Sequence, residues 1–265
     1  MKLSSSTIDL WKKKFDHALP GLLEALTRRE TCVFLIGAAI FDLYQTEEWI
    51  ERFSRQTGDA DFTLEYMGDP REYHLLCQEL KGLGYRQDEE HPYRYHPEKV
   101  TVGTYAYIDL LTFTTDPNMA GNAKSVMGVG EDFNFDGMEY VKLKPILFKD
   151  NILLPNPLAL LFLKAKSYQH NPDRGKDLAD IVELVMRLGQ NKVMDELKLI
   201  ADEVEGKEAI AFLNSLLGHL VDDDRPQWDL DTIKEDLAER LIEEEFGEGS
   251  IVNGLDFFRR KLLEL

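Results

Sequence analysis

The sequence predicts an α/β (α+β) fold, in which a mixed sheet with flanking helices is followed by a helical C-terminal domain. Two observations lead to this prediction. Short apolar runs typical of strands alternate with amphipathic stretches as far as about residue 154. From Pro157 onward, apolar residues recur mainly at helical spacing. We therefore divide the chain into an α/β domain, residues 1–154, and a helical domain, residues 155–265.

The elements follow from periodicity and from turn residues. The first helix is kinked at Pro20-Gly21, Gly37 ends the first strand, and Asp69 and Pro70 are typical of a helix start. A stretch rich in Gly, Asn, Met and Ser is expected to be a loop. In order, we predict helix 6–29, strand 30–36, helix 38–53, a strand from Asp59, helix 69–83, paired strands 85–96 and 100–113, loop 115–130, strands 139–143 and 148–154, and helices 158–169, 176–188, 194–204, 207–220, 233–245 and 255–263.

Composition limits the possible functions. The chain has 265 residues, of which 43% are hydrophobic and 30% charged, as in an ordinary globular protein with a substantial core. Its net charge of −18 argues against an extended nucleic-acid surface. The segment between residues 141 and 176 nevertheless contains seven basic residues and only two acids. This local excess of positive charge indicates either an anion site or a solvated helix face.

Nothing in the sequence suggests a membrane or secreted protein. The longest apolar stretch, near residues 153–163, is interrupted by Asn156 and two prolines, and residues 1–14 have no secretory apolar region. Cys32 and Cys77 stand in apolar surroundings without metal-ligand spacing. We expect both to be buried free thiols in a reducing cytosol, and the protein to be cytoplasmic.

The candidate site is a pair of acids two residues apart. Asp59 and Asp61 begin a predicted strand, and residues i and i+2 of a strand point to the same face. Two adjacent carboxylates repel each other unless a cation is present, and Mg²⁺ prefers such oxygen ligands. Asp109 interrupts a later apolar strand and is a third candidate, although it would also suit a buried acid satisfied by a salt bridge.

These motifs together resemble the nucleotidyltransferase superfamily of polymerase β-like fold, and most closely the AbiEii-type family of bacterial nucleotidyltransferases, which includes toxins of toxin–antitoxin pairs. The resemblance covers residues 33–184 with gaps and leaves the helical tail undetermined. The segments that carry it are FLIGAAIFDLY, RQTGDADF, YIDLLTF and LPNPLALLFLKAKSYQHNPDRGKDLADIVEL.

The resemblance implies a metal-dependent transfer of a nucleoside monophosphate from an NTP to an acceptor hydroxyl on a tRNA end or other RNA, a protein or a small molecule. Asp59 and Asp61 would hold Mg²⁺ or Mn²⁺, Asp109 would be a third metal ligand or the base for the attacking hydroxyl, and Lys164 would contact a phosphate. An antitoxin protein would be a possible partner. The residues implied in nucleotide binding are Gly37, Ala38, Arg55, Thr57, Arg174, Lys176 and Asp177.

One departure from the family pattern leaves a second interpretation open. The family places Gly-Ser or Gly-Gly after the first strand, whereas this chain has Gly37-Ala38-Ala39 and lacks the serine hydroxyl. The alternative is a catalytically silent protein of this fold that acts as a binding or regulatory partner. Two simpler explanations also stand: Lys164 extending from an amphipathic helix to solvent, and Asp177 and Asp180 as ordinary acids of a helix N-terminus.

Overall fold

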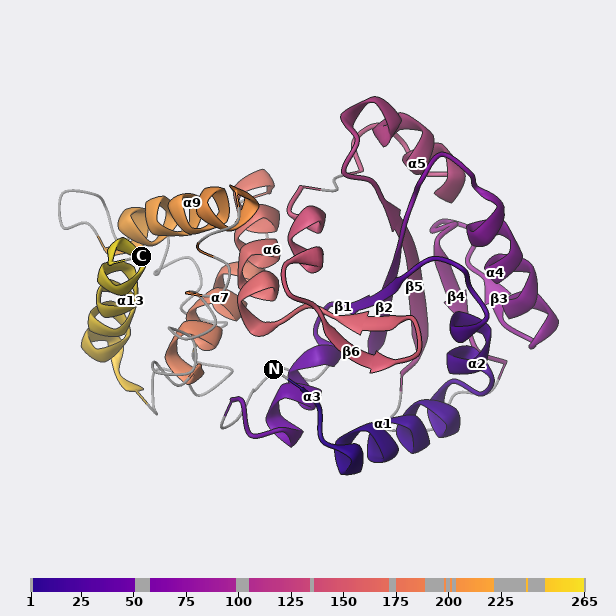
Figure 1. The fold of residues 1–265 in the computed structure, drawn as a ribbon, viewed down its shortest axis with the longest axis horizontal. Helices are drawn as coiled ribbons and strands as arrows, with labels where there is room; N and C mark the ends of the chain where they lie inside the picture. The colour runs from indigo at the N-terminus through magenta and orange to yellow at the C-terminus, as the bar shows by residue number, and fades with distance from the viewer. Residues whose placement is uncertain are drawn as a thin grey trace.

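The protein is described here by a computed structural model that covers residues 2–50, 58–98, 105–133, 136–171, 175–188, 198, 201, 204–221, 237 and 246–264. Figure 1 shows a mixed sheet with helices around it, and a helical region formed by the later part of the chain. This arrangement confirms the predicted fold class. Among the described helices, none combines the length and apolar character needed to cross a membrane.

Seven strands form the described sheet, in the order β3-β4-β5-β2-β1-β7-β6. β1 pairs antiparallel with β2 and parallel with β7, while β2 pairs parallel with β5. The outer strands form two hairpins, β3–β4 and β6–β7. The strands are β1 (Val33–Ile36), β2 (Asp59–Glu65), β3 (Arg86–Gln87), β4 (Arg94–His96), β5 (Tyr107–Phe113), β6 (Ile146–Lys149) and β7 (Ile152–Leu154).

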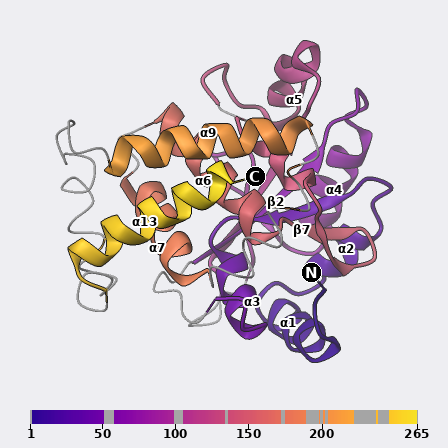
Figure 2. The ribbon, with the colours of Figure 1, turned by 60° about the vertical axis from the view of Figure 1, so that its left-hand side comes forward.

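Helices surround the sheet and then form the second half of the chain. The predicted kink separates α1 from α2, because Gly21 adopts a positive φ of 76° that favours glycine. In Figure 2, α9 and α13 lie side by side across α6 and α7. The helices are α1 (Ser5–Ala18), α2 (Leu22–Thr27), α3 (Ala39–Thr46), α4 (Arg71–Gly82), η1 (Pro117–Met119), α5 (Ala120–Met127), η2 (Met138–Lys142), α6 (Pro157–His170), α7 (Gly175–Arg187), α9 (Val204–Val221) and α13 (Glu248–Leu263).

The junction between the two halves is held by Asn156. Its side-chain oxygen accepts hydrogen bonds from the N–H groups of Leu158 and Ala159, and so caps α6, while Pro157 occupies the first helical turn. The amide group of Asn156 also donates to the carbonyl of Leu143, just after η2. These bonds fix the start of α6 beside the sheet. The predicted domain boundary falls in this junction, between β7 and α6, and stays a prediction.

Several predicted elements need correction. Residues 115–130 form η1 and α5 rather than a loop, because Asp116 caps η1 and Gly128 ends α5 in a left-handed conformation. Residues 139–143 belong to the 3₁₀ helix η2 rather than a strand. Residues 85–96 and 148–154 are hairpin regions rather than single strands, and α3 ends at Thr46. Predicted helices 194–204 and 233–245 lie almost entirely outside the described residues.

The prediction for the cysteines was wrong at Cys32. Both thiols are free, but Cys32 is exposed and Cys77 is only partly buried. Cys32 immediately precedes β1, whose residues Val33–Ile36 are buried, so the apolar run that suggested a buried thiol becomes buried only from Val33 onward. Burial raises the pKa of the Cys77 thiol, which keeps that group protonated at neutral pH.

Candidate active site

The turn between β1 and α3 forms one edge of the candidate site. Gly37 follows the last residue of β1 and adopts a φ of 76°, and Ala38 serves as the N-cap of α3 without a side-chain hydrogen bond. A Cβ atom at Gly37 would lie 1.9 Å from Oδ2 of Asp61. Position 37 therefore requires glycine for two reasons, its backbone conformation and the close approach of a carboxylate.

Replacing Gly37 with alanine is expected to lower the free energy of unfolding by about 1–3 kcal/mol and to displace the Asp61 carboxylate. The strain of a positive φ and the contact with Asp61 both act against the new methyl group. Urea denaturation measures the loss. Gly58→Ala is the matched control, because no atom lies within 4 Å of a Cβ at that position. Equal stability of the two variants would contradict the prediction.

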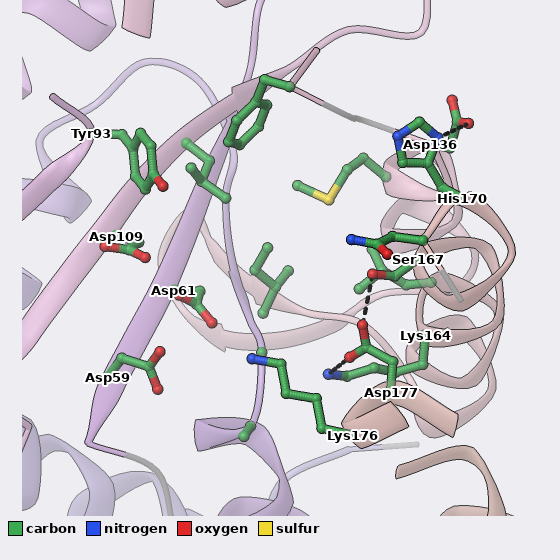
Figure 3. A pocket seen from close by; sticks show the side chains of 18 of the residues that line it. Asp59, Asp61, Tyr93, Asp109, Asp136, Lys164, Ser167, His170, Lys176 and Asp177 are labelled. Atoms are coloured by element: carbon green, nitrogen blue, oxygen red, sulfur yellow. Dashed lines mark hydrogen bonds and ion pairs between the residues drawn. The ribbon is translucent and has the colours of Figure 1, made fainter. Parts of the chain in front are cut away.

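The two predicted acids lie on β2 beside this turn. Asp59 and Asp61 are half-buried and line the same pocket, whereas Ala60 between them is fully buried. The register places Asp61 opposite Ile36 of β1 on one side and opposite Asp109 of β5 on the other. Three carboxylates thus lie on two adjacent parallel strands at one end of the sheet, as Figure 3 shows.

Asp109 is held by an arginine that the sequence analysis did not single out. Arg94 of β4 lies directly opposite Asp109 in the register. Its Nε donates to Oδ1 at 2.7 Å and its Nη2 to Oδ2 at 2.9 Å. The guanidinium also lies 3.9 Å from the centre of the Tyr107 ring, and the Tyr107 hydroxyl donates to Oδ2 of Asp59 at 3.3 Å. The salt-bridge interpretation of Asp109 is therefore what the structure shows.

The pocket has a volume of about 520 Å³ and lies between the sheet and helices α6 and α7. Its sheet side carries the three carboxylates, and its helical side carries Lys164, Lys176 and Asp177. In Figure 3 the exposed side chain of Lys176 extends from α7 toward Asp59 and Asp61. The pocket thus places an ammonium group opposite the paired acids.

Lys164 belongs to a buried ion cluster with two acids of α7. Its Nζ lies 2.9 Å from Oδ1 of Asp177 and 2.7 Å from Oδ2 of Asp180, and Ser167 donates to the other oxygen of Asp177 at 2.9 Å. Lys164 is only 6% exposed, and both acids are fully buried. Lys164 therefore does not extend to solvent. Asp177 does lie in the first turn of α7, but it and Asp180 are also partners of Lys164.

A second part of the pocket is aromatic and apolar. The rings of Tyr93 and Phe133 meet edge to face at 5.6 Å, and Leu111, Met138 and Leu163 line the adjoining wall. Burial raises the pKa of the Tyr93 hydroxyl and of the Tyr107 hydroxyl, so both groups remain protonated donors at neutral pH. This wall offers aromatic and apolar side chains beside the acids.

Acids outnumber bases in the pocket. Among its described lining residues, six carboxylates stand against three permanent cations. An anionic ligand entering such a pocket would be repelled unless additional cations accompanied it. The acids are Asp59, Asp61, Asp109, Asp132, Asp136 and Asp177, and the cations are Arg94, Lys164 and Lys176.

The fit of a divalent metal to this pocket is partial. Asp59 and Asp61 supply the oxygen ligands that Mg²⁺ or Mn²⁺ prefers, on one face of one strand. Asp109, the predicted third ligand, has both oxygens engaged by Arg94. Among the residues that the structure describes, no group of three or more His, Cys, Asp or Glu side chains is arranged to hold a metal ion. The chain as folded therefore fits a site of two carboxylates rather than three.

A second pair of polar side chains, Asp88 and His96, stabilises the β3–β4 hairpin that carries Arg94. Oδ2 of Asp88 lies 2.9 Å from Nε2 of His96, and Oδ1 accepts hydrogen bonds from the backbone N–H groups of Glu90 and His91. The bond with His96 first, and then these backbone bonds, lower the pKa of Asp88 to about 2. The carboxylate is therefore the form that stabilises the hairpin.

Asp88→Asn is expected to destabilise the protein at pH 6 and to have progressively less effect in acid. Because the folded-state pKa of Asp88 lies below its unfolded value of about 3.9, its contribution is complete above that pH and is lost as the pH falls toward 2. Urea denaturation of both proteins between pH 6 and pH 2.5 measures the difference. A difference that did not change with pH would contradict the role of the charge.

Some predicted residues cannot be placed in the pocket. Arg55, Thr57 and Arg174 lie outside the described residues. Among the described basic residues of 141–176, Lys164 is buried, and Lys142 is exposed but paired with Glu65. Sequence reasoning missed Arg94, and the only available signal was its place in a segment predicted to pair with the strand of Asp109.

Comparisons with known proteins give no match to this chain, whether with protein-family models, with curated proteins or with solved structures. The resemblance to the AbiEii-type nucleotidyltransferases therefore stays a prediction from the sequence motifs.

Proposed function

We propose that the protein is a metal-dependent nucleotidyltransferase, which moves a nucleoside monophosphate from an NTP to an acceptor hydroxyl. The observation that carries this proposal is the position of Asp59 and Asp61 beside the β1–α3 turn, in a pocket with Lys176 on its opposite wall. A helix N-terminus, paired acids and a facing ammonium group are together the parts that a polyphosphate site requires.

Phosphate binding is assigned to the β1–α3 turn and to Lys176. Ala38 is the N-cap of α3 and lines the pocket, so the positive dipole end of that helix lies at the pocket. This helix end can attract a phosphate without the serine hydroxyl that this chain lacks. Lys176 supplies a positive charge from the other side. Lys164 holds Asp177 and Asp180 in place, so its role is to fix the start of α7 rather than to bind phosphate.

A divalent metal held by Asp59 and Asp61 would neutralise phosphate charge during the transfer. The acceptor oxygen forms a bond to the α-phosphorus, the bond from that phosphorus to the bridging oxygen breaks, and pyrophosphate leaves. Asp109, when free of Arg94, is placed to accept the proton of the acceptor hydroxyl. The aromatic wall of Tyr93 and Phe133 provides a surface on which a base can stack.

The proposed acceptor is an RNA or tRNA end, a protein hydroxyl or a small molecule. If the protein acts as a toxin, its proposed partner is an antitoxin protein. The test is incubation of the pure protein with each α-³²P-labelled NTP, Mg²⁺ or Mn²⁺, and bacterial RNA and protein. Labelling of one species that is lost in Asp61→Ala supports the transfer and reveals the acceptor class. Labelling that persists in Asp61→Ala, or no labelling with any NTP, contradicts it.

A catalytically silent binding protein is the second candidate, and two observations favour it. Arg94 occupies both oxygens of Asp109, and Ala38 stands where the family has a hydroxyl group. A crystal soaked with Mg²⁺ and a non-hydrolysable NTP separates the candidates. Metal and triphosphate bound at Asp59 and Asp61 would favour the transferase, and an acidic pocket without either would favour the binding protein.

A further inference from the structure

The guanidinium of Arg94 is fixed by three contacts within the candidate site. Two parallel N–H bonds at 2.7 and 2.9 Å join it to the two oxygens of Asp109. Its plane lies over the Tyr107 ring, with 3.9 Å between the guanidinium carbon and the ring centre. A bidentate ion pair stacked on an aromatic ring is geometrically specific and stronger than a single hydrogen bond. Arg94 is thus a built part of the site rather than a chance surface pair.

The same arginine is linked to a second acid. Tyr107 and Asp109 are two residues apart on β5, so both point to the pocket face, and the Tyr107 hydroxyl donates to Asp59. Arg94 therefore contacts one carboxylate of the site directly and another through the ring beneath it. Only 21% of the Arg94 side chain and 11% of the Asp109 side chain are exposed, so solvent screens their attraction incompletely.

A guanidinium in this position opposes metal binding. A divalent ion coordinated by Asp109 would have to share its oxygens with Arg94, and the two cations would repel each other at short range. While both oxygens of Asp109 accept N–H bonds from Arg94, they are less available to a metal ion than the oxygens of Asp59 and Asp61. Among the described residues the three carboxylates on these adjacent strands do not form a three-ligand group, and Asp109 is the one held by the guanidinium.

We propose that Arg94 is the resident counter-ion of this site, which competes with a divalent cation for Asp109 and so weakens binding of the metal alone. The inference rests on the proposed metal-dependent function. A phosphate group entering the pocket gives the guanidinium a second anionic partner, because Arg94 itself lines the pocket. Release of Asp109 then links phosphate binding to metal binding, so that each strengthens the other. The site would take up metal chiefly together with the nucleotide.

The test measures Mn²⁺ binding to the full chain without nucleotide. The electron paramagnetic resonance signal of free Mn²⁺ reports how much of the metal remains unbound. Arg94→Gln is expected to bind Mn²⁺ about tenfold more tightly than the wild type, because the competing charge is removed. In the presence of pyrophosphate, the wild type should gain affinity for Mn²⁺ more than Arg94→Gln does. Asp109→Asn added to Arg94→Gln should cancel the gain, since the extra affinity depends on that carboxylate.

Two further variants control the experiment. Arg86→Gln makes the same change at an exposed position of the neighbouring strand β3 and should leave Mn²⁺ binding unaltered. Arg94→Lys keeps the charge but loses the two-pronged geometry, so it should show a smaller gain in the same direction, and it serves if Arg94→Gln does not fold. Circular dichroism checks the folding of each variant.

The outcomes separate this inference from the function on which it rests. The wild type could bind Mn²⁺ and lose that binding in Asp61→Asn, while Arg94→Gln bound Mn²⁺ equally or more weakly. That result would overturn the proposed competition but leave the metal site at Asp61 supported. The absence of Mn²⁺ binding in every variant would overturn both. Tighter binding by Arg94→Gln that persisted after Asp109→Asn would also overturn the inference, because Asp109 would not be the shared ligand.

Discussion

Asp61→Asn is expected to lower kcat for nucleotide transfer on the order of 10³-fold or more, while the fold stays intact. Asp61 lies at the centre of the site, between Ile36 of β1 and Asp109 of β5, and its carboxylate occupies the space that a Cβ atom at Gly37 would need. Asparagine has the same shape, so it preserves this packing but removes the negative charge that a divalent ion requires. The loss should therefore appear in the chemistry and not in the structure.

Two measurements distinguish a catalytic effect from a structural one. Single-turnover transfer from the labelled NTP gives the rate, and urea denaturation gives the free energy of unfolding. The second should be unchanged or slightly higher, because one of two neighbouring carboxylates has lost its charge. Asp150→Asn is the matched control, since Asp150 lies in the β6–β7 turn, at a φ of 49° that asparagine also accepts. Transfer at the wild-type rate by Asp61→Asn would end the assignment.

Lys164→Met is expected to lower the free energy of unfolding by about 3–5 kcal/mol, the largest stability effect that we predict. The ammonium group lies 2.9 Å from Asp177 and 2.7 Å from Asp180, and both carboxylates are fully buried. Methionine fills a similar volume but leaves two neighbouring acids without this counter-ion. Because removing one partner of a buried ion pair is costly, the packing of α7 on α6 should weaken.

The control for this variant is an ion pair at the surface. Lys142 lies 2.7 Å from Glu65 but is 44% exposed, so Lys142→Met should cost less than about 1 kcal/mol. Adding Asp177→Asn and Asp180→Asn to Lys164→Met should restore part of the lost stability, because the uncompensated charges are removed. Equal effects of Lys164→Met and Lys142→Met in urea denaturation would show that the cluster contributes no more than a surface pair.

Local patterns in the sequence predicted the part of the site that lies within short segments. The apolar run before Gly37 indicated β1, the two-residue spacing placed Asp59 and Asp61 on one face, and a lone acid in an apolar run marked Asp109 on a strand. These inferences depend on periodicity and on turn residues, which act over a few positions of the chain. The mixed sheet followed by helices was predicted for the same reason.

Patterns failed where a segment's structure depends on what packs against it. Residues 115–130 are rich in turn-forming residues, which favour a loop. Two of these residues, Asp116 and Gly128, instead cap η1 and α5. Residues 139–143 have strand-like composition but form η2, beneath α6. Short segments have weak intrinsic preferences, and tertiary contacts override them.

The sequence by itself determined that Gly37 ends a strand and that Asp59 and Asp61 share one face of another, because a strand's alternation and a glycine's conformational freedom are local properties. Only the tertiary structure decided the partners of the charged groups. Arg94 meets Asp109 through the register of β4 and β5, and Lys164 meets Asp177 and Asp180 through the packing of α6 on α7. Register and packing bring together residues distant in the chain, and no periodicity within one segment specifies them.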